Sequence, residues 1–221
     1  MRKLGIFLLL ILVSINVHAF SLFNLHQSDD VSDFLTQAES LDPDVLKLGL
    51  TAYAKLHAEG YDQQEILTII DYSKPSSQPR LWVLDLKNKR IAFQELVAHG
   101  KNSGLDIPTE FSDAIGSETS SIGVFLTGQT YFGHHGLSLK LNGLEQGFNA
   151  HAAERAIVLH PADYVSEQFV KIHGRLGRSW GCPAVRPVIA KYLINTIKDG
   201  TVIFAYYPDK HWLKSSNFLH T

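Results

Sequence analysis

Several residue types are scarce in this chain of 221 residues, and each scarcity limits what the protein can be. The single cysteine, Cys182, excludes an internal disulfide and a cysteine-rich zinc site. With 20 basic and 22 acidic residues the net charge is −2, so the basic surface typical of nucleic-acid binding is missing. Repeats and low-complexity tracts are also missing. What the chain does have is a hydrophobic content of 45%, which is ample for a packed core.

The long apolar run of the sequence is confined to its N-terminus. Arg2 and Lys3 precede an apolar run over residues 4–13, and small residues then permit cleavage after Ala19. The run is short for a membrane span. We therefore interpret residues 1–19 as a secretory signal peptide rather than a retained anchor, and we expect no stable membrane insertion after its cleavage.

Helix signals dominate residues 20–73, which we expect to form a small helical accessory segment. Asp42 followed by Pro43 is typical of a helix N-terminus. Asp62 and Glu65 form an Asp-x-x-Glu capping box, which predicts a further helix over "YDQQEILTIIDYS". A linker rich in proline and serine, "SKPSSQPR", then separates this segment from the rest of the chain.

Strand patterns begin directly after that linker. "RLWVLDL" and "RIAFQELVAHG" flank "KNK" as a hairpin, and further strands are predicted in "SSIGVFLTGQTYF", "LSLKLNG", "ERAIVLH" and "TVIFAYYP". Short helices are predicted in "ADYVSEQFVKIHG" and "RPVIAKYLINTIKDG". Residues 74–210 therefore predict a mainly β (α+β) domain with short helices, followed by a C-terminal tail over residues 211–221.

The stretch "GRLGRSWGCPAV" places the only cysteine in a constrained turn. Gly181 allows the backbone to bend, and Pro183 fixes the φ angle after the cysteine. The helix predicted to begin a few residues later would favour the thiolate through its N–H groups. An inert core cysteine belongs more naturally in an apolar strand. We therefore favour a nucleophilic Cys182 over a structural one.

A nucleophilic thiol needs a base, and two histidines lie close to it in the sequence. His160 ends an apolar strand, where a side chain faces whatever lies beyond the sheet. His173 ends a predicted helix, where a histidine can also simply complement the helix dipole. Both are candidates on these grounds. His134 and His135 are adjacent on a strand and point to opposite faces, so they make a poor chelating pair and no metal site is expected.

The segment "IVLHPADYVSEQFVKIHGRLGRSWGCPAV" resembles the catalytic motif of the L,D-transpeptidases, the YkuD-like cysteine enzymes of bacterial cell walls. It is most similar to the variant subfamily with a Ser-Trp-Gly-Cys-Pro motif, and the resemblance covers roughly residues 75–208. The sequence departs from the usual family pattern at Pro161, Trp180 and Ala184, which stand where Gly, His and Arg are common. The resemblance implies a β-sandwich or barrel with short helices, here preceded by the small helical segment.

The resemblance also implies roles for individual residues. Cys182 would be the acylated nucleophile and His160 its general base, with His173 as the reserve candidate. Gly181 and Ser179 would shape the loop that provides the oxyanion hole. Substrate-binding roles would fall to Trp180, Arg178, Arg175, His173 and Tyr131.

The reaction that the resemblance implies is acyl transfer from a peptidoglycan stem peptide, through a Cys182 thioester, to an amine acceptor. This would be a murein L,D-transpeptidase that needs no cofactor and works as a secreted, periplasmic monomer, with stem peptides as partners and no nucleic acid. One alternative is a cysteine hydrolase on the same scaffold, acting as an L,D-carboxypeptidase or a wall-peptide amidase. The other is a non-catalytic wall-binding module in which Cys182 is merely buried.

Overall fold

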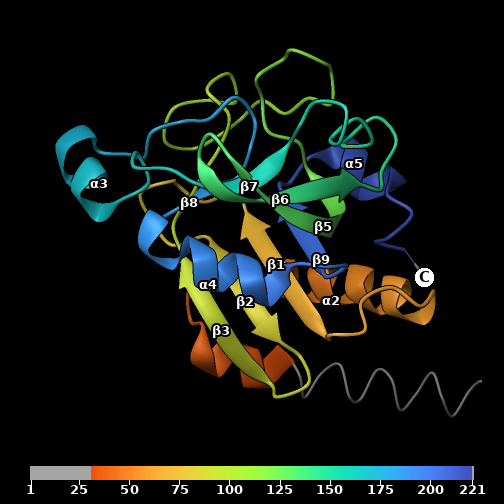
Figure 1. Cartoon of the computed structure of the whole chain (residues 1–221). Helices are drawn as coiled ribbons and strands as arrows, with labels where there is room; N and C mark the ends of the chain where they lie inside the picture. The colour runs from red at the N-terminus through yellow and green to blue at the C-terminus, as the bar shows by residue number, and fades with distance from the viewer. Residues whose placement is uncertain (1–30, 221) are drawn as a thin grey trace, which may run out of the picture.

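The structure is a computed structural model that describes residues 31–220, in which short helices pack on a strongly curved sheet (Figure 1). The expected signal peptide, residues 1–19, lies outside the described residues. Over the described range, no helix combines the length and the apolar character that crossing a membrane requires. The expectation of a mainly β fold with short helices is confirmed.

Nine strands form the sheet. Seven of them overlap the predicted strand patterns, whereas the strand over residues 66–71 falls in a predicted helix and the strand over residues 184–185 was not predicted. The strands are β1 (Ile66–Asp71), β2 (Leu81–Asp85), β3 (Arg90–Glu95), β4 (Val97–Ala98), β5 (Gly123–Gly133), β6 (Gly136–Gly143), β7 (Val158–Pro161), β8 (Ala184–Val185) and β9 (Val202–Tyr206). Their order is β3-β2-β1-β9-β5-β6-β7-β8-β4. Because β3 and β4 are consecutive in the chain yet stand at opposite ends of this order, the sheet is almost closed on itself.

Helices pack on both faces of this curved sheet. They are α2 (Pro43–Ala58), α3 (Glu167–His173), α4 (Pro187–Ile197) and α5 (Lys210–Ser215), and residues 31–37 are also helical. The predicted start of α2 is confirmed, since the Asp42 side chain caps it by accepting hydrogen bonds from the N–H groups of Asp44 and Val45. In Figure 1, α3 projects away from the sheet while α4 packs close to it.

Two hydrophobic clusters fill the two faces of the sheet, as the alternation of side chains along a strand requires. On one face, Leu67 and Ile69 of β1 pack with the buried side of α2. On the other face, Ile66 and Ile70 of the same strand share a cluster with the buried side of α4. The second cluster also contains residues of β6, β7 and β8, so it supports the end of the sheet where the turn around Cys182 lies.

The helix predicted over residues 61–73 is wrong, because β1 occupies the middle of this range. Asp62 does cap a turn, but its carboxylate accepts from the N–H groups of Gln64 and Ile66, and Asp62 and Glu65 both have positive φ angles. Positive φ angles are incompatible with a right-handed α-helix, so no helix forms at these residues. The following "ILTII" is rich in β-branched residues, which favour a strand. The sheet therefore begins before the expected boundary at residue 74.

The last part of the chain also packs on the main body. Trp212 of α5 is fully buried in the same cluster as α2, and its indole N–H donates to the buried Glu145 carboxylate at 3.0 Å. The Asp209 side chain caps α5 by accepting from the N–H of Trp212. Residues 211–220 thus include a docked helix in addition to the expected tail.

Candidate active site

The turn that carries Cys182 is fixed by the hydroxyl of Ser179. This hydroxyl accepts a hydrogen bond from the N–H of Gly181 at 3.1 Å and donates to the carbonyl of Cys182 at 2.6 Å. Ser179 is itself buried and pairs with the segment after β4, through N–H donation to the carbonyl of His99. The geometry matches the expected loop-supporting role of Ser179. It also means that the N–H of Gly181 already has a partner within the loop.

Gly181 is a position where a glycine is required. Its φ is +119°, and a β-carbon there would come within 2.6 Å of the carbonyl oxygen of Thr119. Only glycine adopts this backbone angle and this approach without strain. The hydroxyl of Ser120 donates to the Gly181 carbonyl at 3.1 Å and holds the same turn from a neighbouring segment.

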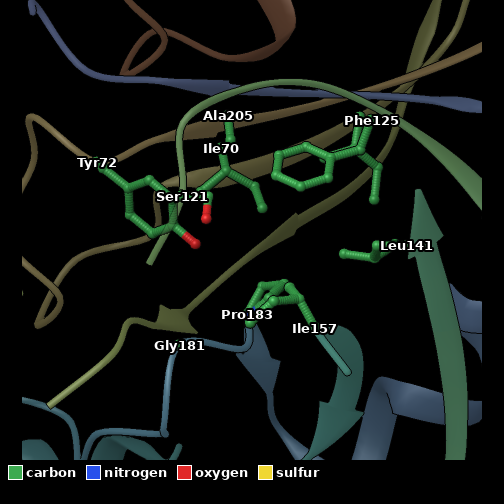
Figure 2. Close-up of a pocket in the computed structure, with 10 residues that line it drawn as sticks. Ile70, Tyr72, Ser121, Phe125, Leu141, Ile157, Gly181, Pro183 and Ala205 are labelled. Atoms are coloured by element: carbon green, nitrogen blue, oxygen red, sulfur yellow. The ribbon is translucent and has the colours of Figure 1, made fainter. Parts of the chain in front are cut away.

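The underside of the turn rests on the apolar interior of the sheet. Gly181 and Pro183, on either side of Cys182, face a cavity of only about 10 Å³. Figure 2 shows its lining, which comprises Ile70, Tyr72, Ser121, Phe125, Leu141, Ile157, Gly181, Pro183, Ile203 and Ala205. A cavity this small leaves the cysteine backbone little room to move.

A large cleft opens above the turn and brings the expected nucleophile and base together. Its volume is about 630 Å³, and both Cys182 and His160 line it. His160 lies on β7 opposite Ala184 of the parallel strand β8, two residues beyond Cys182. The sulfur of Cys182 lies against the start of β7, where the N–H of Val158 donates to it at 3.4 Å.

The hydrogen bonding of His160 defines which ring nitrogen can act as a base. Its Nδ1 lies 2.9 Å from the carbonyl oxygen of Pro161. A carbonyl only accepts, so Nδ1 carries the proton and the neutral ring keeps its lone pair on Nε2. The ring of His135 stacks on that of His160, with 4.5 Å between the centroids. The imidazole is thus oriented from two sides.

Burial keeps both candidate groups uncharged in the free protein. It raises the pKa of the Cys182 thiol, against smaller opposing effects of the Val158 N–H and the Arg155 guanidinium. It also lowers the pKa of His160, and the neighbouring His135 lowers it further. The expected stabilisation of a thiolate by the following helix is not found. Both shifts favour the neutral forms, a thiol on Cys182 and an imidazole on His160, over a thiolate and an imidazolium.

A buried charge network lies behind the turn. The guanidinium of Arg80, fully buried, donates to the carbonyls of Val97 and Lys74 and to Nδ1 of His99 at 2.7 Å. His99 is also fully buried, and its carbonyl accepts from the N–H of Ser179. This network connects β2 to the turn of Cys182, so it contributes to holding that turn in place.

The remaining residues singled out from the sequence separate into two groups. Trp180, Arg178 and Tyr131 line the cleft, with Trp180 strongly exposed at its rim. Arg178 already donates to the carbonyls of Lys101 and Gly104, at 2.9 Å each. Arg175 and His173 are not among the cleft-lining residues, and the ring of His173 packs on Phe169 of its own helix α3. The structure thus places His160, and not His173, in the cleft with the thiol.

Arg155 is a cleft residue that sequence reasoning missed. It lies just before β7 in "ERAIVLH", and its side chain is only 3% exposed. Its sequence neighbours give no signal that it lines a cleft, because the groups that hold its guanidinium come from residues 112–121. Among the described residues, no group of three or more His, Cys, Asp or Glu side chains could hold a metal ion.

The motif, the turn and the cleft agree with a comparison against protein-family models. Residues 37–206 match the family described as the L,D-transpeptidase catalytic domain. The chain belongs to this family. The resemblance noted in the sequence is therefore confirmed, and the nearly closed sheet with short helices is the fold of an L,D-transpeptidase catalytic domain.

Two solved structures that this L,D-transpeptidase domain resembles share little sequence identity with it. No curated protein matches it. Among solved structures, an L,D-transpeptidase from Mycobacterium smegmatis is 13% identical, over 65% of this chain and 59% of that one, with a TM-score of 0.40. The helical cell shape determining protein Pgp2 from Campylobacter jejuni is 12% identical, over 68% and 50%, with a TM-score of 0.46. The chain thus covers only about half to three fifths of these two structures.

Proposed function

We propose that this chain is a cysteine-dependent murein L,D-transpeptidase, with Cys182 as nucleophile and His160 as general base. The observation that carries the proposal is that both side chains line one cleft while His160 keeps its Nε2 lone pair free. The family assignment supports an acyl-transfer enzyme of this kind. The substrate would be the peptidoglycan stem peptide on which such enzymes act, and the protein would be a secreted monomer that works in the periplasm.

The charge of the cleft supports an anionic peptide as substrate. The described residues that line it include Arg155, Arg178 and three histidines, and none of them is acidic. Trp180 at the rim and Tyr131 on the β5–β6 hairpin add exposed aromatic surface. Stem peptides combine carboxylates with a sugar-linked backbone, so a cationic cleft with an aromatic rim suits them.

The first half of the reaction begins with a neutral thiol and a neutral imidazole. The Cys182 proton passes to Nε2 of His160 as sulfur attacks the stem-peptide carbonyl carbon, and the carbonyl π electrons move to oxygen. Among the described residues, the N–H of Cys182 makes no hydrogen bond, so it is available as an oxyanion donor. Collapse of the intermediate breaks the C–N bond, and the departing D-amino acid takes the proton from His160.

The second half of the reaction resolves the thioester. An acceptor amine gives its proton to His160, attacks the thioester carbon and forms the new amide bond. The sulfur leaves and regains a proton from His160. Water in place of the amine would complete a hydrolysis with the same residues, so the acceptor decides between transferase and hydrolase.

The proposal is tested by incubating the purified protein with defined tetrapeptide muropeptides and separating the products. We expect cross-linked dimers from the wild type, and a loss of several orders of magnitude for Cys182→Ala. Intact-mass analysis should find the acyl group on the wild type and none on the variant. Shortened stems without dimers would instead assign the hydrolase, and unchanged muropeptides with retained binding would assign a wall-binding module.

A further inference from the structure

The buried guanidinium of Arg155 is held in the wall of the cleft by neutral groups. Its four hydrogen bonds run to Ser112 O (2.7 Å), Ser121 Oγ (2.5 Å), Ser117 Oγ (3.1 Å) and Thr119 O (2.7 Å). All four partners belong to the loop between β4 and β5. Hydroxyls and carbonyls fix the orientation of the guanidinium but leave its full positive charge in place.

The nearest carboxylate compensates this charge only in part. Asp113 Oδ1 lies 4.0 Å from Arg155 Nη1, which is at the limit of an ion pair. The same carboxylate accepts two hydrogen bonds from the N–H of His151 at 3.1 Å, and its Oδ2 lies 2.8 Å from the His151 ring. Asp113 is thus mainly engaged elsewhere.

This partly compensated charge lies close to Cys182, since the electrostatic effect of Arg155 reaches the thiol. The sulfur contacts the backbone directly after Arg155, at the Val158 N–H (3.4 Å) and the Ala156 carbonyl (3.8 Å). On the other side, Nη2 of Arg155 lies 3.2 Å from where a β-carbon on Gly181 would stand. Arg155 therefore flanks the nucleophile both through its own segment and through the turn.

We propose that Arg155 is a positioning residue that keeps a fixed positive charge beside Cys182 and so stabilises the sulfur as it gives up its proton. This inference rests on the proposed function. In the step where the proton passes from Sγ to His160 Nε2, negative charge develops on sulfur next to a cation that needs no reorganisation. The attraction of Arg155 also acts in the free protein, where it opposes the effect of burial on the thiol.

Other charged and titratable groups face Cys182, and the test must separate their effects from that of Arg155. They are His160 on β7, His135 and His134 at the β5–β6 hairpin, Tyr164 after β7, Arg178 before the turn and Tyr72 beneath it. Apart from Arg178, whose guanidinium is directed to the Lys101 and Gly104 carbonyls, none of them is a permanent cation.

The experiment measures alkylation of the thiol by iodoacetamide against pH, in the full chain, without any substrate. Because Cys182 is the only cysteine, all label reports this one thiol. For Arg155→Gln we expect the pKa of the thiol to rise by about one unit, which lowers the thiolate fraction and slows alkylation at pH 7 by a factor on the order of ten. For Arg155→Lys, which keeps the charge, we expect a profile near that of the wild type.

A second variant, for which we expect faster alkylation, distinguishes an effect of charge from general damage to the fold. Asp113→Asn removes the partial compensation, so alkylation at pH 7 should become faster than in the wild type. Equal slowing by Gln and Lys would overturn the proposal and leave Arg155 as a loop clamp, as would unchanged profiles in all variants. If Arg155→Gln does not fold, an unchanged or slower Asp113→Asn overturns it alone. Since no muropeptide is involved, failure of the proposed reaction would not affect this result.

Discussion

Cys182 and His160 are both neutral at rest, and this sets how the thiol would be activated. Burial raises the pKa of the thiol and lowers that of the imidazole, so each opposes the transfer of the proton before substrate binds. Proton transfer then has to accompany attack on a bound carbonyl. A thiol kept in this state is less open to oxidation, because the thiolate is the reactive form.

The lowered pKa of His160 predicts where activity is lost in acid. A base must be unprotonated, so turnover should hold as pH falls through 6.5, the ordinary value, and decline only below it. His135→Gln removes the stacked ring that lowers this pKa, so the acid limb of kcat/KM should move to higher pH. The pH profile of dimer formation from muropeptides measures both effects.

His134→Gln is the matched control for that measurement. His134 lies beside His135 and lines the same cleft, but it is the ring of His135 that stacks on His160. The control should therefore keep the acid limb where the wild type has it. Equal displacement of the limb by both variants would contradict a specific effect of the stacked ring.

The proposed nucleophile and base could be named from the sequence, but the charge of Arg155 near them could not. Cys182 and His160 belong to a motif that lies within one short stretch of the sequence. The contacts of Arg155 run to residues 112–121, more than 30 positions earlier in the chain. Only the folded sheet brings that loop to the turn, so no local pattern reveals that Arg155 borders the cleft. The same holds for the buried pair of Arg80 and His99.

Helix α2 shows a case where local signals decide the structure, and its cap can be tested. The Asp42 carboxylate satisfies two free N–H groups of the first turn. Asp42→Ala should reduce the free energy of unfolding by about 1 kcal/mol, which is roughly 2–4 °C in Tm for a protein of this size. Thermal unfolding followed by circular dichroism measures the change.

Asp44→Ala serves as the control for the cap. Asp44 carries the same charge in the same turn, but its carboxylate only faces the exposed Lys47 at 3.4 Å. Such an exposed pair contributes a few tenths of a kcal/mol at most. Equal losses in the two variants would mean that charge near the helix end, and not the capping hydrogen bonds, stabilises α2.

Strand β1 shows the converse, since a local signal was present and the rest of the fold overrode it. The Asp62 capping pattern suggested a helix, yet its hydrogen bonds close a turn that leads into β1. β1 pairs with β2 on one side and with β9 on the other, and β9 lies about 130 residues later. Antiparallel hairpins such as β2–β3 were predictable from the sequence, whereas this parallel pairing of distant segments was not.

The interior of the protein contains a positive charge, the guanidinium of Arg80. Arg80 is fully buried, its hydrogen bonds go to two carbonyls and to His99, and none goes to a carboxylate. Burial and the adjacent Arg80 together lower the pKa of His99 to about 3. Protonating His99 would place two cations side by side in the core, so the folded chain keeps this histidine neutral over most of the acid range.

The neutral His99 makes the stability of the whole chain dependent on pH. In the unfolded chain His99 binds a proton below its ordinary pKa of 6.5, whereas in the folded chain it does so only near 3. Between these values the unfolded state binds more protons, so stability falls as pH falls, by up to about 1.4 kcal/mol per pH unit from this group. Urea unfolding at about pH 7.5, 6.5, 5.5 and 5.0 measures the slope. The range stops at about pH 5 because most carboxylates stay ionised above it.

His99→Gln separates this effect from those of the other titrating groups. The amide oxygen can accept from Arg80 as Nδ1 does, and the side chain does not titrate. The variant will lose some stability at every pH, because its shape differs from that of imidazole. Its slope between pH 6.5 and 5, however, should be shallower than that of the wild type, because the contribution of His99 is removed. Parallel curves for the two proteins would contradict this prediction. They would mean that His99 has the same pKa in the folded and the unfolded chain, so that neither burial nor Arg80 lowers it.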